Sequence, residues 1–88
     1  MNIADRVGRV LLPGDEICWV SKSYGSPVLK RGIFLGIEEE LCGDYLSVKM
    51  IATVWKHGVK EKAYKGYAYA GYIKKNADLV KLSFVEKI

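Results

Sequence analysis

Residues 45–55 read YLSVKMIATVW, and this stretch decides the fold class. Every second residue from Leu46 to Val54 is apolar, whereas Lys49 and Thr53 occupy positions between them. Alternation with a period of two is typical of a β-strand that buries one face and exposes the other. A helix would distribute the same apolar residues around its whole circumference, with Lys49 among them. The pattern therefore predicts a long antiparallel strand, half buried, in an all-β protein.

Shorter stretches on both sides of this segment predict the other strands and the turns between them. The expected strands are residues 16–22, 33–39, 45–55, 59–73 (one strand or two, bent near Gly66) and 80–85. Turn-forming residues separate them at 13–15, 23–32, 39–44, 56–60 and 74–79. Residues 1–12 favour a short N-terminal helix that begins at Asn2. Five short strands with apolar faces favour a small closed or half-closed barrel, because a flat sheet would leave one apolar face in water.

The 88 residues are 50% apolar and 27% charged, which is typical of one globular domain with a small core. A core of this size makes a homo-oligomer plausible, with a stoichiometry that the sequence leaves open. No apolar run approaches the length of a membrane span, and the N-terminal residues do not resemble a secretory signal. We therefore expect a cytoplasmic protein without a membrane partner.

The residue types do not assemble into a catalytic or metal site. His57 is the only histidine, and no Ser/His/Asp or Cys/His set can be placed around it. In its apolar run, Cys18 is expected to be a small buried residue, and Cys42 is expected in a turn. Two thiols with one histidine do not make a zinc site. The stretch GYAYAG lacks the ending of a phosphate-binding loop. We expect a protein that is not an enzyme and that carries no cofactor and no metal.

The positive charge is concentrated in one segment. The chain has a formal net charge of +4, but residues 54–75 alone carry six lysines against Glu61, so the other 66 residues are slightly acidic. A local excess of this kind is the footprint that a polyanion recognises. A solvated lysine-rich hairpin that serves solubility is the alternative explanation.

Four tyrosines are interleaved with these lysines in residues 62–75, KAYKGYAYAGYIKK. Aromatic rings that stack on bases, beside lysines that follow phosphates, are typical of a surface for single-stranded nucleic acid. If the strand pairs regularly, we expect Tyr67 and Tyr69 on one side and Tyr64 with Tyr72 on the other. The alternative is that the rings cover one end of the core. The predicted ligand-binding residues are Tyr64, Tyr67, Tyr69, Tyr72, Trp55, Lys56, Lys60, Lys62, Lys65, Lys74 and Lys75, with Tyr45 and Lys49 as an extension of the platform.

The sequence thus predicts a non-enzymatic binding module for single-stranded nucleic acid or another anionic nucleotide ligand. The competing hypothesis is a protein-interaction module, because a Tyr-rich edge strand can pair with a partner's strand or with its own copy. Affinity for nucleic acid should fall steeply with salt, whereas an apolar protein interface should hardly respond.

The segments PGDEICWVSK, KRGIFLGI and ADLVKLSF resemble SH3-like small barrels of the KOW and Tudor type, including short barrel proteins of tailed bacteriophages. The matching positions are Gly14, Asp15, Gly32, Asp78 and Val80. The resemblance covers residues 13–84 of a single domain (1–88) and implies a five-stranded barrel. It also implies, as a form of the alternative function, a phage protein that inhibits a host protein or sequesters a nucleotide signal. The Tyr/Lys-rich hairpin 56–75 departs from the family because it is longer than the usual connection there.

Overall fold

The computed structural model describes residues 2–23, 25–56, 59–74 and 79–88, with every side chain in these ranges except those of Lys22, Ser23 and Tyr69. The described residues form strands and turns and contain no helix, so the all-β prediction is confirmed. The seven strands are β1 (Asn2–Ala4), β2 (Glu16–Ser23), β3 (Ser26–Cys42), β4 (Tyr45–Lys56), β5 (Val59–Lys74), β6 (Leu79–Lys81) and β7 (Val85–Lys87). Within these ranges no helix is long and apolar enough to cross a membrane.

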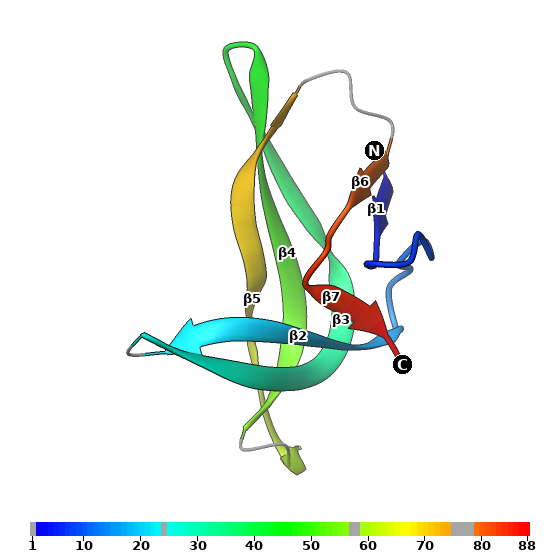
Figure 1. Cartoon of the computed structure of the whole chain (residues 1–88), viewed down its shortest axis with the longest axis vertical. Helices are drawn as coiled ribbons and strands as arrows, with labels where there is room; N and C mark the ends of the chain where they lie inside the picture. The colour runs from blue at the N-terminus through cyan, green and yellow to red at the C-terminus, as the bar shows by residue number, and fades with distance from the viewer. Residues whose placement is uncertain (1, 24, 57–58, 75–78) are drawn as a thin grey trace.

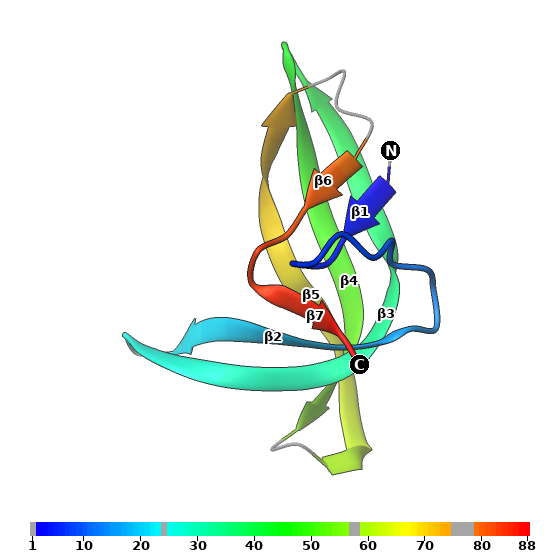
Figure 2. The ribbon, with the colours of Figure 1, turned by 45° about the vertical axis from the view of Figure 1, so that its right-hand side comes forward.

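Five strands form one antiparallel sheet in the order β5-β4-β3-β2-β7, and β1 pairs with β6 in a small parallel sheet. The first part of β3, Ser26–Ile33, pairs with β2, and the second part, Gly32–Cys42, pairs with β4. As a result, the β2–β3 hairpin crosses the long ribbon of β4 and β5 (Figure 1, Figure 2). In the described part of the chain the edge strands β5 and β7 do not pair with each other, so the sheet is open rather than a closed barrel.

The change of direction in β3 depends on local backbone features. The register with β4 shifts between Phe34 and Gly36, which leaves Leu35 unpaired as a β-bulge, and bulges bend a strand and increase its twist. Gly36 has a φ of 146°, a conformation that glycine adopts easily. Gly32 pairs with both β2 and β4, and a Cβ atom there would overlap the carbonyl oxygen of Thr53. These residues allow one strand to serve both halves of the sheet.

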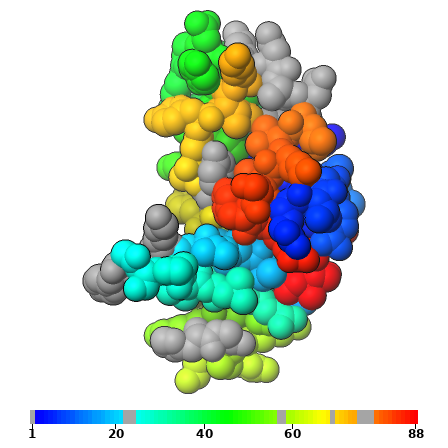
Figure 3. Space-filling view, in the orientation of Figure 1, coloured from blue at the N-terminus to red at the C-terminus, as the bar shows by residue number. Residues whose placement is uncertain are grey.

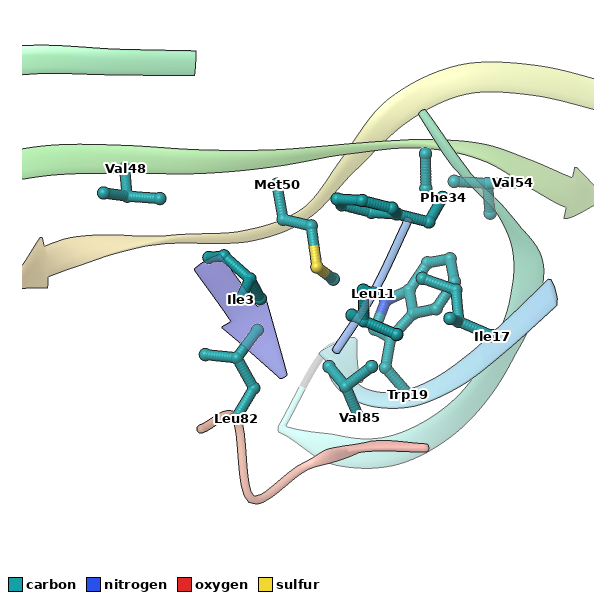
Figure 4. Packing of buried hydrophobic residues seen from close by; sticks show 11 residues of the cluster. Ile3, Leu11, Ile17, Trp19, Phe34, Val48, Met50, Val54, Leu82 and Val85 are labelled. Atoms are coloured by element: carbon teal, nitrogen blue, oxygen red, sulfur yellow. The ribbon is translucent and has the colours of Figure 1, made fainter. Parts of the chain in front are cut away.

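The core lies on the concave side of the bent sheet, where β1 and the β6–β7 segment cover it (Figure 4). The alternation predicted for residues 45–55 is confirmed, because Val48, Met50, Ala52 and Val54 of β4 are buried and Leu46 is partly buried. Trp19 of β2 is the largest fully buried side chain. The buried apolar residues are Ile3, Ala4, Leu11, Ile17, Trp19, Phe34, Val48, Met50, Ala52, Val54, Leu82 and Val85.

Three sequence-based predictions for the ends and the first connection are wrong. Instead of a helix, the N-terminus forms β1, because Asn2–Ala4 pairs with β6 and Asp5 ends the strand in a turn. The expected loop at 23–32 is a hairpin followed by the start of β3, because residues 26–32, Pro27 and Gly32 included, pair with β2. The expected last strand is split by a turn into β6 and β7, and Leu82 between them is buried.

Asp5 joins the N-terminal turn to the C-terminal strand. Its fully buried carboxylate accepts hydrogen bonds from the backbone N–H of Val7 (3.1 Å), of Arg9 (2.9 Å) and of Lys87 (3.0 Å), and from Nε of Arg9 (2.8 Å). Burial of the carboxylate raises its pKa, but the donors at Lys87, Arg9 and Val7 outweigh burial and lower the pKa to about 2. The charged form of Asp5 is therefore part of the folded structure.

Candidate ligand-binding cleft

A cleft opens where β3 and β4 separate. Gly32 and Val54 form the last pair between these strands, after which β3 pairs only with β2 and β4 only with β5. The two hairpins diverge from this point, and the β2–β3 hairpin projects to one side of the molecule (Figure 3). The space between them has a volume of about 830 Å³. Its lining residues are Val28, Leu29, Lys30, Arg31, Val54, Trp55, Lys56, Lys62 and Tyr64.

Both walls of the cleft are strand edges. Residues 26–31 of β3 are paired with β2 on one side, and no strand among the described residues pairs with their other side. Trp55 and Lys56 likewise pair with β5 but have no partner in β3. Backbone N–H and C=O groups along such edges can bind the polar groups of a ligand.

The lining of the cleft is strongly positive. Lys30, Arg31, Lys56 and Lys62 line it, and none of the lining residues that the structure describes is acidic. Arg31 also forms an ion pair with Glu16, with a distance of 2.9 Å between Nη2 and Oε2, which partly neutralises its charge. The three lysines therefore provide most of the attraction for an anion.

Trp55 and Tyr64 provide the aromatic surface of the cleft. The guanidinium carbon of Arg31 lies 4.9 Å from the Trp55 ring centroid, and Nζ of Lys60 lies 5.9 Å from it. Cations at these distances are attracted to the ring, so they help to fix its position. Because Glu16 holds Arg31, the orientation of Trp55 depends on a chain of contacts that begins in β2. Tyr64 is about half exposed.

The structure divides the predicted binding residues between two surfaces. Trp55, Lys56, Lys62 and Tyr64 line the cleft, and Lys60 lies beside it. Tyr67, Tyr72, Lys65 and Lys74 lie instead along the rest of β5. The side chain of Tyr69 and the whole of Lys75 are outside the described residues, as are His57 and Asp78.

The prediction that Tyr64 and Tyr72 share one side of a regular strand is wrong. Tyr64 pairs with Val54 on the core side of β4, whereas Tyr72 pairs with Ser47 on the outer side. The cause is a bulge at Ala68, which the ladder skips between Tyr67 and Tyr69. A bulge changes the face of every residue that follows it, so the strand presents rings on both faces.

Residues 28–31 were missed by the sequence analysis because they were assigned to a loop. The signal that identifies them is the cation pair Lys30–Arg31 directly before Gly32, the glycine from which β3 turns away from β4. Lys56 and Lys62, the other cations of the lining, become their neighbours only through the fold.

Another group of charged residues lies outside the cleft. Glu38, Glu39 and Glu40 line a smaller pocket of about 340 Å³ together with Ser47 and Lys49. Both cysteines are free, and within the described ranges no three His, Cys, Asp or Glu side chains are grouped to hold a metal ion.

In comparisons with known proteins, no protein family, curated protein or solved structure matches the chain.

Proposed function

We propose that the protein is a non-enzymatic binding module and that its cleft binds single-stranded nucleic acid. The observation that carries the proposal is the grouping of Trp55 and Tyr64 with three lysines in a cleft that has no acidic residue among its described lining. Duplex nucleic acid hides the faces of its bases, whereas a single strand can place a base against an exposed ring.

Each part of the cleft has a chemical role in this proposal. A base that stacks on Trp55 or Tyr64 gains about 1–3 kcal/mol, and the gain depends little on base identity. Lys30, Lys56 and Lys62 neutralise phosphates and release counterions. The free edges of β3 and β4 offer hydrogen-bond donors and acceptors to the base edges.

The test is the affinity of labelled oligothymidylate of eight nucleotides, measured by fluorescence anisotropy at several salt concentrations. For three or four phosphate contacts, the logarithm of the association constant should fall with the logarithm of salt concentration with a slope of about −2 to −3. Trp55→Ala should weaken binding about tenfold or more and leave this slope unchanged. Lys62→Gln should reduce the slope by about 0.7, because one phosphate contact is lost.

Lys81→Gln is the matched control, because Lys81 is an exposed lysine of β6, away from the cleft (Figure 1). It should leave both affinity and slope unchanged. Equal affinities for the wild type and Trp55→Ala, or an affinity that does not respond to salt, would contradict the proposal. A free mononucleotide can be tested as a competitor of the labelled oligothymidylate. If it competes as strongly as the unlabelled oligonucleotide does, the ligand is a nucleotide instead.

A second candidate function, protein interaction, is favoured by the free edge of β5. Among the described strands β4 is the only hydrogen-bonded neighbour of β5, so one edge of Val59–Lys74 is open to a partner strand. A partner bound there, including a host protein or a second copy of the chain, should remain bound at high salt. The Trp55→Ala variant should still bind such a partner, which would distinguish binding at the edge of β5 from binding in the cleft.

We keep the SH3-like barrel as a proposal for the architecture. The antiparallel order of five strands and the sharp bend of β3 support it, because this bend brings two halves of one sheet over a common core. A closed barrel would require hydrogen bonds between β5 and β7, and amide hydrogen exchange of β5 would reveal them as slow exchange along its outer edge.

A further inference from the structure

The ladders place a second set of rings and lysines on the outer face of β4 and β5. In an antiparallel pair, residues directly opposite each other lie on the same face of the sheet. The buried residues of β4 mark the core face, so their neighbours in sequence mark the outer face. The outer pairs are Thr53 with Lys65, Ile51 with Tyr67, Ser47 with Tyr72, and Tyr45 with Lys74.

The rings on this face are accessible to a ligand. Tyr67 is 58% exposed and Tyr72 is 70% exposed, so neither side chain is part of the core. Nζ of Lys49 lies 5.4 Å from the centroid of the Tyr67 ring, which places a cation beside the most central ring. The surface thus combines exposed aromatic groups with cations, as the cleft does.

Acidic residues border this surface on one side only. Glu38 and Glu40 of β3 pair with Lys49 and Ser47, so they lie on the outer face along the β3 side. A phosphate chain would be repelled from this border. On the β5 side the outer face carries Lys65 and Lys74 instead. An anionic strand is therefore confined to the side of β5.

The outer face is continuous with the cleft through Trp55. Trp55 lines the cleft and also follows Ile51 and Thr53 at alternate positions of β4, so it belongs to the outer face. Its partner in β5 is Ala63. From Ala63 to Tyr72 the strand covers roughly 30 Å, which corresponds to about nine stacked nucleotides at about 3.4 Å each.

We propose that a single strand held in the cleft continues past Trp55 over Tyr67 and Tyr72, along the outer face of β5. This inference rests on the proposed function and extends the site from a few nucleotides to about twelve. In this extension Lys65 and Lys74 contact the phosphates. Repulsion from the acidic border on β3 keeps the nucleic acid along β5.

The test compares oligothymidylates of four and of twelve nucleotides on wild-type protein and on the variants Tyr67→Ala and Tyr72→Ala. Each variant should weaken the 12-mer about fivefold or more, because one stacked base is lost. Binding of the 4-mer, which fits the cleft alone, should stay within about twofold of wild type. Tyr72→Phe keeps the ring and should bind the 12-mer like wild type. Because both tyrosines are exposed, the variants should keep the wild-type circular dichroism spectrum.

The outcomes separate this inference from the proposed function. If the 12-mer binds to wild type and is lost with Trp55→Ala but is unaffected by Tyr67→Ala and Tyr72→Ala, the extension is wrong and the cleft stands. If the tyrosine variants weaken both oligonucleotides equally, the extension is also wrong. If wild-type protein binds neither oligonucleotide, the extension and the proposed function both fail.

Discussion

Asp5 shows how a single residue can hold both ends of the chain together. Among the described residues it is the only charged side chain that is fully buried, and its four hydrogen bonds join the N-terminal turn to β7. The sequence offered no signal for this role, because the partner Lys87 is distant in sequence and contributes only its backbone N–H. A buried carboxylate of this kind is stable only while all of its donors are in place.

Asp5→Asn should destabilise the protein by about 2–3 kcal/mol, because the amide cannot accept all of the hydrogen bonds that the carboxylate accepts. The measurement is urea unfolding followed by tryptophan fluorescence, since Trp19 is only 2% exposed when folded and becomes exposed on unfolding. Asp44→Asn is the matched control, because Asp44 is exposed in the turn between β3 and β4. Equal destabilisation by both variants would contradict the role assigned to Asp5.

The same residue predicts how stability depends on pH. The folded pKa of Asp5, about 2, is below the ordinary value of 3.8, so its contribution to stability is complete above pH 3.8 and is lost as the pH falls toward 2. The lost contribution is roughly 2 kcal/mol. The free energy of unfolding of wild type should therefore fall toward that of Asp5→Asn over this pH range. A constant difference between the two proteins from pH 5 to pH 2 would contradict the prediction.

At the same scale, the sequence predicted part of the cleft. Trp55, Lys56, Lys62 and Tyr64 were identified because a dense run of rings and lysines is visible in one segment. The sequence did not identify the opposite wall, residues 28–31, because its two cations belong to a different hairpin. Local composition identifies one wall of a cleft, but the fold decides which segment faces it.

At the scale of elements, β4 and β5 illustrate what periodicity can predict. The alternation in β4 is regular over its whole length, so its buried face could be read directly from the sequence. The glycines and alanines of β5 carry no strong alternation, and nothing in them indicates a bulge at Ala68. The length of β5 was predicted correctly, and Tyr67 lies on the opposite face from Tyr64 as predicted, but the face of Tyr72 was predicted wrongly.

The bend of β3 provides the prediction at this scale. Gly32→Ala should destabilise the protein by about 2–4 kcal/mol, because the new Cβ would overlap the carbonyl oxygen of Thr53 and force β3 away from β4. Gly66→Ala is the matched control, since its Cβ would lie 3.3 Å from a ring carbon of Tyr64, a side chain that can move. Thermal unfolding of both variants measures the difference, and a Gly32→Ala protein as stable as Gly66→Ala would show that this close packing is unimportant.

At the scale of the whole molecule, shape and charge both favour the cleft as the place where a polyanion binds. The radius of gyration is 13.0 Å, slightly above the value of about 12 Å expected for 88 residues, because the hairpins project from a small core. The cleft between the diverging hairpins is lined by four cations, whereas Glu38–Glu40 lie toward the turn between β3 and β4. This separation of charge would direct an approaching polyanion to the cleft. It is a consequence of folding, since Lys30 and Lys62 are distant in the sequence.

The most direct test of the account is nuclear magnetic resonance of ¹⁵N-labelled protein titrated with an unlabelled oligothymidylate of eight nucleotides. Binding in the cleft predicts that the largest amide shifts occur in residues 28–31, 54–56 and 62–64, together with the indole N–H of Trp55. The indole N–H of the buried Trp19 should hardly move. Spectra that do not change, or shifts confined to residues 38–40 and to β1 and β6, would contradict the central claim.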